Sequence, residues 1–222
     1  MKLVHCEISG ILLNDNTDFT EWIMESPEVF SEYVQELNEQ VLGAEGRFVL
    51  SEKDKEIDLS KKADIIFNPF TVEVNSRKVL SRLYAELSNI AKNEQMFVKT
   101  AEFLKIVQKY MLDLEHCTDY ILEFDSELNI TDLLKAINLR YETQYINFHD
   151  KLMQYIKVMA SVGAKIFVFV NIRSYLKDDI LQEMIKEMKY LNLQGLLIES
   201  VQKNSLEGVN QYVIDKDKCE LY

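Results

Sequence analysis

One stretch near the end of the chain constrains the fold more than any other. Two strand-like runs, Lys165–Val170 and Gly195–Ile198, are almost entirely apolar, and an amphipathic segment from Asp178 to Leu191 separates them. A strand that is apolar on both faces needs helices on both sides of its sheet. Two such strands joined by a helix predict a right-handed βαβ crossover between parallel neighbours. We therefore expect an α/β fold around a mostly parallel sheet.

Earlier segments fit the same architecture. Arg47–Leu50 and Ala63–Phe67 are short runs typical of strands, and we expect both in this sheet. Lys2–Leu13 is typical of an edge strand or hairpin. The sequence Ser26–Glu28 supplies an N-cap, a proline at the first helical position and an early acid, so it predicts the start of a helix. Gly43 is placed to end that helix.

Residues 76–162 have a different pattern. Apolar residues recur at three- and four-residue spacing on both sides of the polar stretch Lys92–Gln95, and strict heptad spacing returns in Tyr145–Val162. Two heptad segments that leave and re-enter one domain predict an antiparallel helical arm. The expected domains are an α/β head made of residues 1–75 and 163–222, and a long helical arm inserted at residues 76–162.

A parallel sheet raises the question of a phosphate-binding loop, which needs clustered glycines, a lysine and a hydroxyl group. The segment Leu13–Thr20, which we interpret as a loop, has no glycine, and Gly43–Gly46 is not followed by Lys-Ser or Lys-Thr. Asn171 follows an apolar strand at a position where nucleotide hydrolases often keep a magnesium-binding aspartate. We therefore expect a degenerate P-loop-like head that neither binds nor hydrolyses ATP, in a protein that is not an enzyme.

The cysteines are odd in number and scattered, without any CxxC spacing. Cys6 and Cys117 each follow a histidine, but adjacent residues rarely share one tetrahedral zinc site. We expect all three, with Cys219, to be reduced and buried in a cytoplasmic protein. The amino terminus becomes charged too early for a signal peptide, and the longest uncharged apolar run is too short to span a bilayer.

Three carboxylates alternate at Glu123, Asp125 and Glu127, just before a short helix that opens near Thr131. Alternate side chains of an extended segment point to one side, and several oxygen ligands on one side suit Ca²⁺. A solvated acidic turn near a helix start explains the same pattern, and the spacing alone favours that simpler reading.

The net charge of -12 argues against non-specific affinity for nucleic acid, unless basic residues gather on one face. Arg77, Lys78 and Arg82 lie where the first helix of the arm opens, and Lys135 and Arg140 bracket the end of the short helix. Solvated helix faces explain each of these residues taken alone.

Several segments occur in an order and spacing that match one protein family from about residue 64 to the end of the chain. They are Val72–Ser76 with Leu80, Leu83, Tyr84 and Leu87, then Leu122–Asp125, Leu133–Lys135, Arg140–Thr143, Lys165–Asn171, Tyr175–Leu176, Leu193 and Gln211–Asp215. Together they resemble the Csn2 family, the CRISPR-associated adaptation proteins of type II-A loci. The first sixty residues match poorly, and the acidic segment carries one extra residue beside Ser126.

The resemblance implies a homotetrameric ring whose subunits each have an α/β head and a helical leg. Calcium supports the assembly in that family, which makes Glu123, Asp125 and Glu127 the expected ligands. The ring would bind the ends of double-stranded DNA through its central hole during spacer acquisition. Other CRISPR adaptation proteins and the effector nuclease are the further partners implied, with no role for a membrane.

The resemblance also reconciles DNA binding with a negative net charge, because a ring can be acidic outside and basic inside. Lys135 and Arg140, and next Arg77 and Lys78, match basic positions of the family and are the expected DNA contacts. Two alternatives remain: a nucleotide-dependent phosphotransferase or NTPase with a divergent P-loop, and a protein-binding adaptor that uses the helical arm.

Overall fold

The computed structural model describes every residue except 124, 126–128, 144–146 and 222, together with the side chain of Lys78. The chain forms two compact units. Unit 1 comprises Met1–Glu73 and Gln144–Tyr222, and unit 2 comprises Val74–Thr143.

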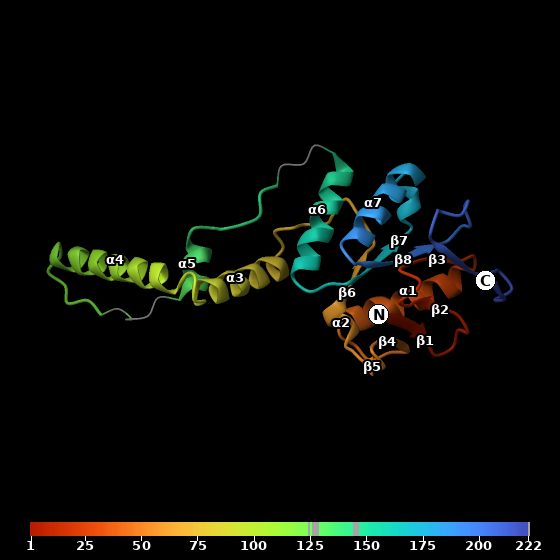
Figure 1. Cartoon of the computed structure of the whole chain (residues 1–222), viewed down its shortest axis with the longest axis horizontal. Coiled ribbons are helices and arrows are strands. Elements are labelled where there is room, and N and C mark those ends of the chain that lie inside the picture. The colour runs from red at the N-terminus through yellow and green to blue at the C-terminus, as the bar shows by residue number, and fades with distance from the viewer. Residues whose placement is uncertain (124, 126–128, 144–146, 222) are drawn as a thin grey trace. The chain divides into compact units, whose positions relative to one another are not determined.

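Unit 1 is built on a six-stranded sheet (Figure 1). The strands stand in the order β10-β9-β3-β8-β7-β6, and all neighbours pair in parallel except β9 and β10. Their bounds are β3 Phe19–Met24, β6 Ala63–Ile66, β7 Ile166–Val170, β8 Gln194–Glu199, β9 Asn210–Ile214 and β10 Glu220–Leu221. The expected mixed α/β fold with a mostly parallel sheet is confirmed.

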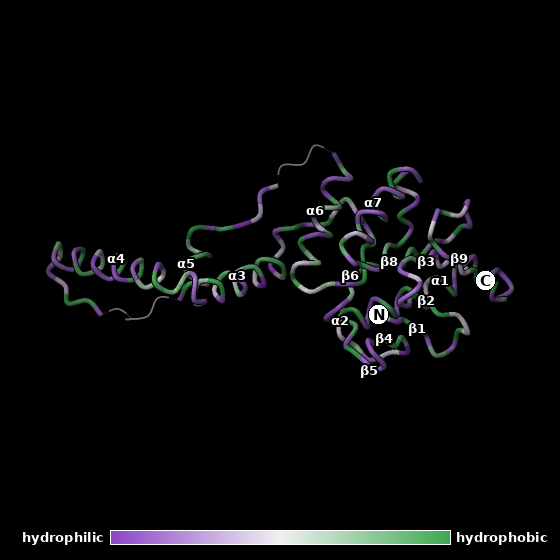
Figure 2. The backbone as a smooth tube through the Cα atoms, viewed as in Figure 1, coloured by the Kyte–Doolittle hydropathy of each residue, from purple (hydrophilic) through white to green (hydrophobic). Residues whose placement is uncertain are grey.

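The predicted βαβ unit is confirmed as well. Helix α7 (Asp178–Tyr190) joins β7 to β8, and the two strands pair in parallel from Ile166 opposite Gln194 to Val170 opposite Ile198. Every residue of both strands is buried. Figure 1 shows why: α6 (Phe148–Ser161) and α7 lie on one side of the sheet, and α1 (Pro27–Val41) lies on the other. Figure 2 shows hydrophobic stretches of backbone, in green, in the region of β6 and β8.

A second, four-stranded antiparallel sheet stands in the order β2-β1-β4-β5. Its strands are β1 Lys2–His5, β2 Ile11–Leu13, β4 Phe48–Glu52 and β5 Lys55–Glu56. The amino-terminal hairpin is therefore confirmed, but the placement of Arg47–Leu50 in the parallel sheet is wrong. In β4 only Phe48 and Leu50 are buried, and Val49 between them is half-buried. This alternation is typical of a sheet with one covered face.

The interpretation of Leu13–Thr20 as a loop is wrong at its end, because strand β3 begins at Phe19. It lies at the centre of the sheet, between β8 and β9, and all six of its residues are buried. Two of those residues are polar. The Thr20 hydroxyl donates to the carbonyl of Leu12, and Glu21 pairs with an arginine described below. Because both polar groups find partners inside the protein, the strand tolerates them, but they interrupt its apolar pattern.

Helix α1 starts after Ser26 with Pro27 at its first position, as predicted. It buries Val29, Val34 and Leu37 in the core that both sheets share with Trp22. Gly43 ends it with a φ of 103°, a left-handed conformation that a side chain would strain. The short helix α2 (Leu59–Lys62) follows strand β5 and is capped by Asp58.

Unit 2 contains α3 (Arg77–Ala91), α4 (Phe97–His116) and α5 (Ile130–Ala136). The expected interruption at Lys92–Gln95 lies between α3 and α4. The bounds of the compact units differ from the expected insertion at 76–162, because α6 lies in unit 1 with Leu152 and Ile156 fully buried.

All three cysteines are free, as predicted, but they are exposed, so the prediction that they are buried is wrong. Cys6 lies in a turn after β1, Cys117 caps the end of α4, and Cys219 directly precedes β10. Turns and helix ends leave such side chains in solvent. Among the described residues, no helix is both long and apolar enough to cross a membrane.

Candidate nucleic-acid interface

All the basic residues expected to contact DNA lie in unit 2, on α3 and around the end of α5. Hydrogen bonds hold these two places together. The Asn75 side chain donates to the carbonyl of Tyr141 at 3.0 Å and accepts from its N–H at 2.9 Å. The Tyr84 hydroxyl donates to the carbonyl of Leu139 at 2.7 Å. The backbone on both sides of Arg140 is therefore attached to α3, through Asn75 just before the helix and Tyr84 within it.

The end of α5 explains how the chain reaches that position. Asn138 has a φ of 51°, the left-handed conformation that asparagine tolerates better than most residues. Its N–H donates to the carbonyl of Lys135, and the N–H of Leu139 donates to that of Leu134. This pair of bonds is the Schellman motif, which ends a helix and turns the chain back. The turn carries Leu139 to its partner Tyr84.

Arg77 and Arg140 are thus brought to the same end of α3. Both are exposed, and neither has an ion-pair partner in the part of the chain that the structure describes. Lys135 is also exposed, but its ammonium group lies 2.9 Å from Asp132 in a surface ion pair. The side chain of Lys78 lies outside the described part. Of the four predicted DNA contacts, Arg77 and Arg140 therefore lie toward the same end of α3 and have no ion-pair partner among the described residues.

Charge is unevenly distributed along unit 2. Residues 77–109 carry seven lysines and arginines against three carboxylates, and residues 113–127 carry six carboxylates and no lysine or arginine. Glu123 and Asp125 are both exposed, and Glu127 lies outside the described residues. No group of three metal-binding side chains forms among the residues that the structure covers. The calcium site therefore stays a prediction.

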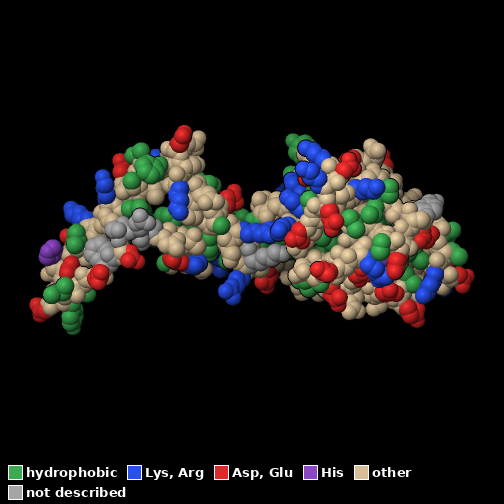
Figure 3. Space-filling view, turned by 90° about the horizontal axis from the view of Figure 1, so that it is seen from below, with side chains coloured by type: hydrophobic (Ala, Val, Ile, Leu, Met, Phe, Trp, Pro, Cys, Tyr) green, Lys and Arg blue, Asp and Glu red, His purple; other side chains and the backbone are tan. Residues whose placement is uncertain are grey.

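Helix α4 has a feature that the sequence pattern did not reveal. None of its twenty residues is buried. Phe103, Tyr110 and Leu114 are 39%, 58% and 42% exposed, and with Val107 they follow heptad spacing along one face. Hydrophobic side chains accordingly appear at the surface of unit 2 in Figure 3. A helix of this kind is typical of one that packs against a partner.

The carboxyl edge of the main sheet is the usual ligand site of an α/β protein. The connection from β3 to α1 has only two residues, Glu25 and Ser26, neither of them glycine. A phosphate-binding loop at this position would need several residues to wrap around a phosphate. Asn171 directly follows β7 with a φ of 53°, and its side-chain oxygen accepts from the N–H and hydroxyl of Ser200.

Arg173 fills the space beside that edge. Its guanidinium contacts Glu21 at 2.7 Å and Asp178 at 2.8 Å, and the side chains of Arg173 and Glu21 are fully buried. Glu199 is 2% exposed and accepts from the backbone N–H of Arg173 at 3.0 Å. The pKa of Glu199 is raised to about 7. Burial is the main cause, and the negative charge of the neighbouring Glu21 acts in the same direction. No periodic pattern predicts this network, because its members come from distant segments of the chain.

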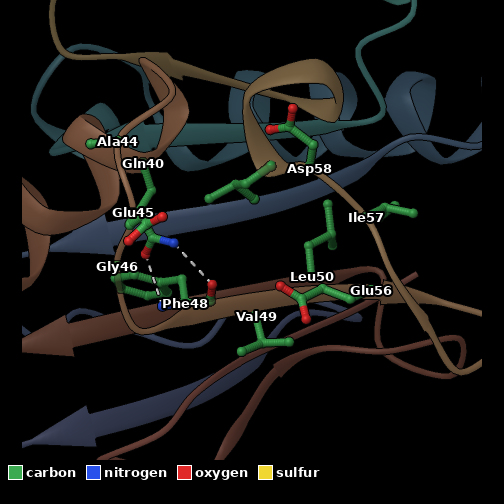
Figure 4. A pocket seen from close by; sticks show the side chains of 11 residues that line it. Gln40, Ala44, Glu45, Gly46, Phe48, Val49, Leu50, Glu56, Ile57 and Asp58 are labelled. Carbon is green, nitrogen blue, oxygen red and sulfur yellow. Dashed lines mark hydrogen bonds between the residues drawn. The ribbon is translucent and has the colours of Figure 1, made fainter.

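A hollow of about 580 Å³ lies beside β4 (Figure 4). The Gln40 amide closes one end of it by donating to the carbonyl of Phe48 at 3.0 Å and accepting from its N–H at 2.8 Å. Three carboxylates line the hollow, those of Glu45, Glu56 and Asp58, and no lysine or arginine is among its described lining residues. This distribution of charge disfavours phosphate binding there.

Comparisons with known proteins agree with the resemblance. The family model described as CRISPR-associated protein (Cas_Csn2) matches residues 40–218. A CRISPR-associated protein Csn2 from Streptococcus agalactiae is 32% identical over 148 residues, and one from Enterococcus faecalis is 25% identical over 150 residues. Each match covers 65% of this chain and 65% of the relative. Because the family model spans well over half of its length, the chain belongs to the Csn2 family of CRISPR-associated proteins.

Proposed function

We propose that this chain is a cytoplasmic, non-catalytic protein that binds the ends of double-stranded DNA during CRISPR spacer acquisition, as a calcium-supported homotetrameric ring. The observation that carries the proposal is the basic pair Arg77 and Arg140, held at one end of α3 without ion-pair partners in the described part of the chain. Guanidinium groups bind phosphate oxygens through two parallel hydrogen bonds. Contacts of this kind position DNA without reading its sequence.

The exposed apolar face of α4 supports self-association. Exposed hydrophobic side chains at heptad spacing gain most by packing against a second helix. A second copy of the chain supplies such a helix, and a closed ring repeats the contact in every subunit. Other CRISPR adaptation proteins and the effector nuclease are the expected further partners.

The acidic stretch at residues 113–127 supports the calcium role. Six carboxylates within fifteen residues repel one another, and a divalent cation with oxygen ligands relieves that repulsion. Glu123 and Asp125 are exposed and accessible to an ion. We propose that these two and Glu127 contribute ligands.

The carboxyl edge of the sheet supports a function without nucleotide hydrolysis. The two-residue connection after β3 and the buried pair of Arg173 and Glu21 occupy the place where a nucleotide phosphate would bind in related architectures. We expect calorimetry with ATP and Mg²⁺ to give no measurable heat of binding. A micromolar site would instead favour the phosphotransferase alternative.

DNA binding can be tested with linear and closed circular duplexes at several salt concentrations. We expect a preference for linear duplex, because a closed circle cannot thread a ring. Affinity should be independent of sequence and fall with salt, with a slope of log K against log salt of about 0.9 per phosphate contact. Equal binding to circles and linear DNA would contradict threading.

Variants identify the face that binds. Arg77→Ala with Arg140→Ala should lower both the affinity and the salt slope, and Lys135→Ala should have a smaller effect because Lys135 is already paired. Lys61→Ala in unit 1 is a matched control, an exposed lysine in a similar ion pair. Unchanged affinity of the double variant would show that another face binds. No DNA affinity at low salt would favour the protein-binding adaptor.

The calcium role has its own test, sedimentation with and without Ca²⁺. Glu123→Gln with Asp125→Asn should weaken calcium affinity and loosen the oligomer, because two carboxylate ligands lose their charge. Glu94→Gln with Glu102→Gln, also in unit 2, controls for the change in net charge. If the first double variant leaves both properties unchanged, the acidic segment is a solvated turn.

A further inference from the structure

The four-stranded sheet of unit 1 has an edge that strand β5 covers only in part. β5 pairs with the last two residues of β4, Ser51 and Glu52. Just before them, the N–H of Ile57 donates to the carbonyl of Leu50 at 2.9 Å. No described strand pairs with Phe48 on that side of β4. An open backbone edge is a template on which another chain can add a strand.

The Gln40 amide occupies the place of the missing strand. The N–H of Cys6 in the turn after β1 donates to the carbonyl of Arg47, so the backbone groups of the next residue, Phe48, point away from β1. Gln40 donates to the carbonyl of Phe48 at 3.0 Å and accepts from its N–H at 2.8 Å. One side-chain amide thus makes both hydrogen bonds that a residue of a neighbouring antiparallel strand would make.

Two features of the chain allow this contact. Gln40 lies in the last turn of α1 and is only 8% exposed, so its amide is held against the strand. Gly46 leaves the room that the amide needs, because a Cβ at that position would lie 2.5 Å from the Cδ of Gln40. Figure 4 shows Gln40, Gly46 and Phe48 together at one end of the hollow beside β4.

The carboxylates of that hollow add a barrier against a second copy of the chain. Glu45 and Glu56 are exposed and have no ion-pair partner in the part of the chain that the structure describes, whereas Asp58 pairs with Lys61. Pairing of two copies edge to edge about a two-fold axis brings the same surface of each copy together. The like charges oppose such a contact, and salt weakens their repulsion.

We propose that the Gln40 side chain blocks this edge, so that the four-stranded sheet does not pair with the β4 edge of a second copy of the chain. An incoming strand must break both hydrogen bonds of Gln40 before it makes its own, so pairing exchanges bonds for bonds and gains little. Without the amide, the incoming strand gains both bonds. The edge lies wholly in unit 1, apart from the α4 face and the basic residues of the proposed function.

Two variants open the edge in different ways. Gln40→Met removes the amide, and Gly46→Ala displaces it while leaving Gln40 in place. Gln35→Met, at an exposed glutamine of the same helix, is the control. Sedimentation equilibrium of the full chains in EDTA, with the wild type alongside, measures the association. Both variants should associate about tenfold or more tightly than the wild type, because two hydrogen bonds are gained. Their association should strengthen with salt.

Hydrogen exchange identifies the surface that pairs. The Phe48 amide should exchange faster in dilute Gln40→Met than in the wild type, and it should regain protection as the protein concentration rises. Circular dichroism establishes that the variants are folded. The proposal is wrong if the folded variants associate no more than the Gln35→Met control, or if they associate while the Phe48 amide stays unprotected. Loss of folding in both variants would show that Gln40 stabilises the fold rather than blocking an edge.

Discussion

The two units of this chain are stabilised in different ways. Unit 1 buries whole strands and even an ion pair, with Arg173 and Glu21 fully removed from solvent. Unit 2 contains the longest helix described, α4, in which no residue is buried. Its other two helices are joined by hydrogen bonds from the side chains of Asn75 and Tyr84 to backbone that is distant in the sequence. The difference teaches that burial secures unit 1, whereas α4 of unit 2 has no buried side chain to stabilise it.

Of the variants that compare the two units, Arg173→Met is expected to lower the free energy of unfolding most. The change leaves Glu21 buried without its counter-ion, which typically costs about 3–5 kcal/mol. Urea denaturation followed by circular dichroism measures this cost. Arg140→Met, the same change at an exposed position of unit 2, should cost less than about 0.5 kcal/mol. Similar losses for both variants would remove the contrast between the units.

The dependence of stability on pH gives the next effect. Glu199 has a pKa of about 7 in the folded protein against 4.5 for the free side chain. The stability that Glu199 contributes to the folded protein is fully present below pH 4.5 and is lost as the pH rises through 7. The reason is that burial opposes ionisation of this carboxyl group in the folded state but not in the unfolded state. The loss is about 3 kcal/mol. Glu199→Gln should remove it, while the amide oxygen can still accept from Arg173.

The measurement is the free energy of unfolding of Glu199→Gln minus that of the wild type. It should grow from below about 1 kcal/mol near pH 5 to about 3 kcal/mol above pH 8. Glu207→Gln, an exposed acid of unit 1, should show no such trend. A difference that is constant with pH would mean that Glu199 is ionised throughout.

A smaller effect, confined to unit 2, is expected from Asn75→Ala. It removes two hydrogen bonds to Tyr141 and should cost about 1–2 kcal/mol of local stability. Faster amide exchange at Leu139 and Tyr141, with unchanged exchange in β7, would show it. Asn89→Ala, the same change at an exposed position of α3, is the control and should leave exchange unchanged.

The smallest effects concern the end of α5. Asn138→Gly should change stability by less than about 0.5 kcal/mol, because glycine adopts a φ of 51° without strain. Asn138→Ala should cost about 1 kcal/mol, since alanine is strained there. Thermal unfolding of both variants gives the comparison. Equal stability of the two would mean that the turn is not held in the left-handed conformation.

Sequence patterns predicted the parts of unit 1 whose burial is uniform. The strands Ile166–Val170 and Gln194–Glu199 could be predicted because they are almost continuous apolar runs, and helix α7 because its apolar residues recur with the helical period. Strand β3 could not, because its buried Thr20 and Glu21 depend on partners 8 and 152 residues away in the sequence. Pairing over such distances leaves no local signal, and the Arg173 network was missed for the same reason.

In the candidate interface, composition identified basic residues but not how they are brought together. The expected contacts Arg77 and Arg140 are 63 positions apart in the chain, and what joins them is the Asn75 amide and the Tyr84 hydroxyl. Asparagine before a helix is usually a cap. Here the Asn75 side chain instead bonds backbone that is distant in the sequence, and no pattern in a single sequence predicts such a contact.

The uncovered apolar face of α4 has a thermodynamic consequence. Anything that covers the helix binds the folded chain and not the unfolded one, so it adds RT ln(1 + [L]/Kd) to the free energy of unfolding. At a partner concentration one hundred times its dissociation constant, this linkage is worth about 2.7 kcal/mol. If that partner is a second copy of the chain, as proposed above, the melting temperature depends on protein concentration, and dilution loosens unit 2 before unit 1.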